Sequence, residues 1–137
     1  MRTATIVIIG LVATVLTACA GSVADSASIS GTVTYLQRIA LPQGAMLTVE
    51  LVDISLADAP AVTLGAYSSQ PVTQVPLPFT IAYDPADIID NHTYALQAQI
   101  HDAQGKLWFR NTTKFLVLTN GQPSDKVEIV LDMVSGQ

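Results

Sequence analysis

The stretch "YALQAQI", residues 94–100, has the two-residue period of a β-strand with one buried face. Tyr94, Leu96, Ala98 and Ile100 fall on one side of such a strand, and the residues between them fall on the other. A helix would instead gather apolar residues three and four positions apart. The stretch therefore predicts a strand that packs four side chains into a core and turns its glutamines to water.

The same alternation recurs along the chain from residue 29 onward, and turn-forming residues separate the runs. Gly44 in "LPQGA" and Gly105 in "DAQGK" mark two such turns. About seven regularly spaced strands without a long helical pattern predict an all-β fold, an antiparallel β-sandwich. The expected runs are 29–35, 47–51, 62–66, 79–83, 94–100, 107–117 and 127–133, and in the third of them Val62, Leu64 and Ala66 are expected to face inward.

One short helical turn is predicted near residues 84–89, within "YDPADIIDNH". Asp84 is a typical N-cap residue, Pro85 suits the first helical position, and Asp87 lies in the acidic first turn that the helix dipole favours. We expect this single turn to cross between the two sheets.

Composition narrows the class of protein. Half of the 137 residues are hydrophobic and 12% are charged, which excludes an intrinsically disordered chain. The net charge is −5 and there is no basic stripe, so neither nucleic acid nor anionic lipid headgroups are expected partners. The single cysteine cannot form an intrachain disulfide, so the hydrophobic core has to hold the fold.

The N-terminus has the pattern of a secretory signal peptide. Arg2 supplies a positive charge, and residues 4–16 form an apolar run that is too short to cross a bilayer core, which needs about 20 residues. We expect residues 1–18 to be the signal peptide, residues 19–28 to be a flexible tether, and residues 29–137 to form the β-sandwich domain.

The end of this signal, Leu16-Thr17-Ala18-Cys19, resembles the bacterial lipobox. The resemblance implies that a diacylglycerol alkylates the Cys19 thiol, that cleavage follows Ala18, and that the new amine is acylated. Two or more acyl chains hold a protein firmly to a membrane, at about 0.8 kcal/mol per buried CH₂. Ala20, in place of the aspartate that retains such lipoproteins at the inner membrane, implies the inner leaflet of the outer membrane, facing the periplasm. The alternative is a plain signal peptide with a chance cysteine.

Titratable residues do not form a recognisable catalytic or metal motif. His92 and His101 are expected to be isolated surface histidines, and the acids 84, 87 and 90 lack the alternate spacing and glycine of a calcium loop. We therefore predict no enzyme, no cofactor, no metal site and no small-molecule substrate. A hydrolase remains the alternative if Asp84, Asp87, His92 and His101 converge in a pocket.

Trp108 and Arg110, on either side of Phe109, are a candidate interface. Adjacent strand residues face opposite sides, so Trp108 and Phe109 cannot both be in the core. If Phe109 is inside, then Trp108 and Arg110 point outward, where an exposed tryptophan often marks a binding surface. The alternative places Trp108 in the core.

Three stretches carry a family resemblance: "RIALPQGA" at 38–45, "DISLADAP" at 53–60 and "YDP" at 83–85. With their surroundings, from about residue 31 to 134, they resemble the YbaY-like lipoproteins, which are related to the YscW-type pilotins of type III secretion systems. The resemblance implies a small β-sandwich lipoprotein without catalytic residues. Pilotins hold a secretin subunit and use their lipid anchor to carry it to the outer membrane, whereas most YbaY-like members have no defined activity.

These observations predict a lipid-anchored, periplasm-facing module of the outer membrane that binds an envelope protein such as a secretin. An exposed strand edge or a groove between the sheets are two ways to hold a peptide. The alternative is an envelope structural or stress lipoprotein without a single client.

Overall fold

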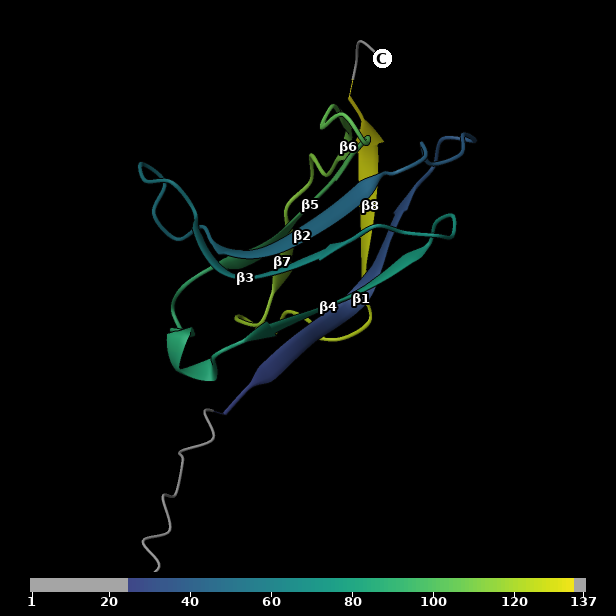
Figure 1. Cartoon of the computed structure of the whole chain (residues 1–137). Coiled ribbons are helices and arrows are strands. Elements are labelled where there is room, and N and C mark those ends of the chain that lie inside the picture. Colours follow the sequence, from purple (N-terminus) through teal and green to yellow (C-terminus); the bar gives the residue numbers. More distant parts are fainter. Residues whose placement is uncertain (1–24, 135–137) are drawn as a thin grey trace, which may run out of the picture.

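The computed structural model describes residues 25–134 (Figure 1). The predicted signal peptide and Cys19 lie outside these residues. The elements in chain order are β1 (Ala27–Tyr35), β2 (Met46–Asp53), β3 (Val62–Ser69), β4 (Leu77–Tyr83), η1 (Pro85–Asp87), β5 (Tyr94–His101), β6 (Leu107–Arg110), β7 (Phe115–Val117) and β8 (Val127–Met133).

The strands follow the order β3-β2-β5-β6-β8-β1-β4, and β7 pairs with β5 beside β6. Only two residue pairs join β6 to β8, so this pairing links a layer of β4, β1 and β8 to a layer built around β2 and β5. At the other side the edge strands β3 and β4 approach each other closely. A Cβ atom on Gly65 of β3 would lie 2.6 Å from the carbonyl oxygen of Ala82 in β4, so glycine permits this near-closure into a barrel-like sheet.

The all-β fold class and the short helical turn are confirmed. One strand pair differs from a purely antiparallel arrangement, because β1 and β8 run parallel from Gly31↔Val127 to Tyr35↔Leu131. At Gly31 the two backbones are so close that a Cβ atom would lie 1.9 Å from the carbonyl oxygen of Val127. In η1, the Asp84 side chain accepts a hydrogen bond from the Ala86 N–H at 2.8 Å, which is the predicted cap.

The core contains the predicted apolar face of β5, together with residues of β1, β2, β4 and β8. The expectation for the third run was wrong at two positions, since Val62 is 59% exposed and Ala66 is exposed as well. The pairing of β2 with β3 contains an irregularity after Leu51 that skips Leu64, and Val49 pairs with Tyr67. The parity of β3 therefore turns Tyr67 rather than Ala66 toward the core.

Helices are a minor part of the fold. Between residues 25 and 134, no helix has the length and apolar character needed to cross a bilayer.

A polar pocket on the outer face of the sheet

The pocket lies where the ladder beside β5 is interrupted. β6 pairs with β5 at Gln99–His101, and β7 pairs with β5 at Tyr94–Leu96. Residues 111–114, which connect β6 to β7, leave the ladder between these two pairings. The interruption opens a pocket of about 320 Å³ beside β5.

The side chain of Asn111 forms the hydrogen bonds that a neighbouring strand would otherwise form with β5. Its Oδ1 accepts from the Ala98 N–H at 2.7 Å, and its Nδ2 donates to the carbonyls of Leu96 at 3.2 Å and Thr113 at 2.9 Å. The Asn111 N–H also donates to the Ala98 carbonyl at 3.1 Å. Ala98 and Leu96 are almost fully buried, so these bonds satisfy backbone groups that would be costly to leave unpaired.

The pocket is lined by side chains on the face of the sheet that points away from the core. Gln97 and Gln99 on β5, and Glu50, which pairs with Gln97 from β2, all point away from the buried face. Residues 110–114 form the other wall. The pocket therefore opens on the outer face of the sheet and not between the two layers.

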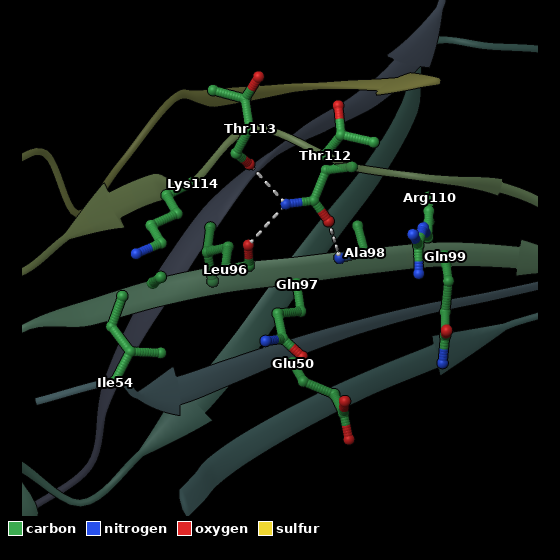
Figure 2. A pocket seen from close by; sticks show the side chains of 12 residues that line it. Glu50, Ile54, Leu96, Gln97, Ala98, Gln99, Arg110, Thr112, Thr113 and Lys114 are labelled. Atoms are coloured by element: carbon green, nitrogen blue, oxygen red, sulfur yellow. Dashed lines mark hydrogen bonds between the residues drawn. The ribbon is translucent and has the colours of Figure 1, made fainter. Parts of the chain in front are cut away.

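Two positively charged side chains line the pocket, Arg110 and Lys114, and they lie at its opposite ends (Figure 2). We refer to them as the two cations. They are two of the five lysines and arginines in the part of the chain that the structure describes, where acids predominate. The one ion pair among residues 25–134 is elsewhere, between His92 and Asp53. Asp132, the register partner of Arg110 on β8, instead accepts a hydrogen bond from the Thr112 hydroxyl. The two cations are thus available to a ligand.

Trp108, Phe109 and Arg110 have different environments in the structure. Phe109 is fully buried and stacks on Tyr35, with ring centroids 4.2 Å apart. Trp108 is half-buried, packs against the margin of the core, and donates from Nε1 to Asp102 Oδ2 at 3.1 Å. Arg110 lines the pocket and Trp108 does not. A role of either residue in an interface remains a prediction.

His92 has a partner that sequence reasoning missed. Its Nδ1 lies 2.6 Å from Asp53 Oδ2, and its side chain is 31% exposed. Asp53 also accepts from the backbone and hydroxyl of Ser55, and the Ser55 hydroxyl accepts from the Thr93 N–H at 2.8 Å. Desolvation raises the pKa of Asp53, but the hydrogen bonds from Ser55 and His92 outweigh it and hold the pKa below its ordinary value.

This cluster ties the end of β2 to the loop before β5. The Ser55 hydroxyl bonds to the carboxylate and not to the imidazole, so the arrangement lacks the nucleophile–base contact of a hydrolase. Asp84 caps η1, and His101 ends β5 at Met46↔His101, the opposite end of the β2–β5 ladder from Asp53. The four residues of the hydrolase alternative therefore do not converge. Residues 25–134 also contain no group of three or more histidine, cysteine or acidic side chains that could hold a metal ion.

The predicted lipidation residue Cys19 and the cleavage residues Leu16, Thr17 and Ala18 lie outside the described residues, so their roles remain predictions.

Comparisons with known proteins agree on the family. The model of the type III secretion system lipoprotein chaperone YscW matches residues 24–131. The chain is 34% identical over 99 residues to the uncharacterized lipoprotein YbaY of Escherichia coli strain K12, covering 72% of this chain and 52% of YbaY, so it spans about half the length of that relative. The solved structure of an alternative pilotin from the type II secretion system of Vibrio cholerae superposes with a TM-score of 0.76 at 40% identity, covering 82% of this chain and all of the pilotin. The chain belongs to the YscW family of secretion-system lipoprotein chaperones.

Proposed function

We propose that this protein is a lipid-anchored, periplasm-facing module that binds a segment of an envelope protein, such as a secretin subunit, at the outer membrane. The observation that carries the proposal is the polar pocket with two cations that have no ion-pair partner among residues 25–134. The YscW family and the likeness to a type II pilotin support a chaperone-like role, because both group the chain with proteins that serve secretion systems.

The anchor restricts where such a module works. We expect acyl chains on Cys19, and six residue steps separate Cys19 from Asp25, where the described chain begins. An extended chain spans at most about 3.5 Å per residue, so the domain is held within roughly 20 Å of the bilayer surface. A partner bound to it is thereby brought close to the membrane, and holding a client in this way requires no catalytic group.

The partner is tested by purification of the full chain from detergent-solubilised envelopes of its own host. We expect a secretin subunit or another envelope protein to copurify, and we expect that subunit to lose its outer-membrane location in a strain without the gene. A strain that secretes normally but has a leaky envelope, with no copurifying protein, would contradict the proposal and favour a structural lipoprotein without a single client.

The anchor is tested by Cys19→Ser. Mass spectrometry of the intact wild-type protein should show a chain that begins at Cys19 and carries acyl groups, and the variant should remain unprocessed and unacylated. Finding the variant processed and bound to membranes like the wild type would refute the lipid anchor and leave the binding pocket as a separate question.

A further inference from the structure

We infer that the pocket on the outer face recognises an acidic peptide segment, with its carboxylates bound to Arg110 and Lys114. The inference rests on the proposed function, because it names the chemistry of the partner segment that the pocket holds. Three features of the pocket support it: the hydrogen-bonded backbone beside β5, the charges around the pocket, and the spacing of the two cations.

Backbone pairing excludes one mode of peptide binding. Peptides often add a strand to an exposed sheet edge, which requires unpaired backbone groups. At the interruption beside β5, Asn111 already bonds to the Ala98 N–H and to the Ala98 and Leu96 carbonyls. On its other side, β5 is paired with β2 over its whole length. A peptide in the pocket therefore cannot pair with β5 as an added strand, which leaves its contacts to the side chains that line the pocket and to the wall formed by residues 110–114.

The charges favour a ligand with carboxylates. Arg110 and Lys114 supply two positive charges, and each forms charge-assisted hydrogen bonds with a carboxylate that enters the pocket. Two acids lie nearby. Asp132 accepts from Thr112, and Glu50 occupies the β2 side of the pocket, opposite the wall formed by residues 110–114. Glu50 therefore confines the acidic side chains of a ligand to the wall that carries the cations.

The spacing favours a peptide over a small anion. Arg110 pairs with Gln99, and Lys114 directly precedes Phe115, which pairs with Leu96. In this antiparallel register the position before Phe115 corresponds to Gln97, so the two cations are about two residue steps apart along β5, roughly 7 Å. Side chains two positions apart lie on the same face of an extended segment at this same spacing, so an extended peptide with acidic residues two positions apart can offer each cation its own carboxylate, whereas one small anion offers a single group. A volume of about 320 Å³ accommodates a few side chains.

The test uses the full lipidated chain in detergent and two synthetic nonapeptides that differ only in charge. One peptide carries two glutamates two positions apart in a Gly/Ser background, and the other carries glutamines there. Ligand-observed NMR should show binding of the glutamate peptide, at least about fivefold weaker binding of the glutamine peptide, and loss of the difference in high salt. Equal binding of both peptides, or no binding of the glutamate peptide at millimolar concentration, would overturn the inference.

Matched charge reversals locate the site. Arg110→Glu and Lys114→Glu should each weaken binding of the glutamate peptide at least about fivefold, while Arg38→Glu and Lys106→Glu, which change the net charge equally at exposed sites away from the pocket, should not. An equal loss in the controls would mean that net charge and not the pocket binds the peptide. Full displacement by millimolar acetate would show a site for small anions, and it would also overturn the inference.

The outcome is distinguishable from that of the proposed function. If an envelope protein copurifies equally with wild type and Arg110→Glu, the module binds its partner elsewhere, and only the pocket inference fails. If the glutamate peptide binds but no envelope protein copurifies, the pocket inference survives and the proposed function fails.

Discussion

The two sides of β5 are built differently. On one side β2 pairs with it at eight consecutive positions, from Met46↔His101 to Asp53↔Tyr94. On the other side β6 and β7 each pair with three positions, and residues 111–114 turn away between them. The first side is a continuous ladder, and the second is a ladder with a polar pocket in it.

The difference assigns separate tasks to the two sides. The β2 side positions the core residues Leu51 and Leu96 opposite each other, both fully buried. The interrupted side gives up regular pairing and relies on the side chain of one residue, Asn111, to satisfy the backbone. Stability is therefore expected to concentrate on the continuous side and recognition on the interrupted side. Substitutions on the continuous side should therefore have the largest effects on stability, and substitutions of the pocket cations the smallest.

Truncation on the continuous side should be the most damaging change. Leu51→Ala removes a fully buried side chain and leaves a cavity, which should lower the free energy of unfolding by about 2–5 kcal/mol. Leu36→Ala makes the same chemical change at a residue that is 79% exposed, and it should stay within about 0.5 kcal/mol of wild type. Equilibrium urea unfolding followed by circular dichroism measures both, and equal effects would contradict the assignment of the core.

Removing the Asn111 side chain, which bonds to the backbone of β5, should have the next largest effect on stability. Asn111→Ala leaves the Ala98 N–H and the Leu96 carbonyl without their partner, and we expect a loss of about 2–3 kcal/mol in the free energy of unfolding. Thr113→Ala, at an exposed neighbour on the same pocket wall, serves as the control in the same urea titration. Equal stability of the two variants would show that water replaces the amide and that the interruption needs no special residue.

The free energy of unfolding should depend on pH through Asp53, which lies at the end of the continuous ladder. Because its folded pKa is lowered, the folded state binds a proton less readily than the unfolded state, and the stabilisation is fully present above the ordinary value of 3.8 and is lost as the pH falls through the folded pKa. Asp53→Asn should cost about 1–2 kcal/mol at neutral pH, and it should flatten the decline in stability below pH 3.8.

An acid in the loop that follows β2 provides the control for Asp53. Asp58 is exposed and its side chain has no hydrogen bond or ion pair to residues 25–134, so Asp58→Asn changes the net charge by the same amount without removing such a contact. A profile that flattens equally in both variants would attribute acid sensitivity to net charge and not to the Asp53 cluster.

Local pattern predicts the continuous side of β5 well and the interrupted side poorly. The alternation in residues 94–100 identifies the buried face of β5, and the parity of residues 108–110 puts Trp108 and Phe109 on opposite faces without deciding which of them is buried. The Asp84 cap is equally local, because the side chain bonds two residues away. In each of these cases the partner lies within the same short stretch of chain or is the core itself.

Pairings between segments that are distant in the sequence produce no local sequence pattern from which they could be predicted. Gly31 and Val127 lie next to each other because two strands far apart in sequence pair in parallel, and no periodicity specifies that choice. His92 and Asp53 meet only because the ends of β2 and β5 are in register. Asparagine is common in loops, so nothing in the sequence around Asn111 indicates that its side chain bonds to the backbone of β5. That role follows only from the interruption of the ladder beside Ala98. The pocket is therefore a product of register, which sequence patterning alone does not determine.

The smallest expected effect on stability concerns the two cations, and it sharpens the division most. Arg110 and Lys114 form no ion pair with residues 25–134, so Arg110→Ala and Lys114→Ala should each change the free energy of unfolding by less than about 0.5 kcal/mol in urea titrations. The same variants should weaken binding of the acidic peptide, although by less than the charge reversals do. A residue that serves binding and not folding should weaken peptide binding without changing stability. A loss above about 1 kcal/mol in the free energy of unfolding would instead mean that the cations help to stabilise the interrupted ladder. In that case the contrast between the two sides of β5 would be one of pairing geometry alone.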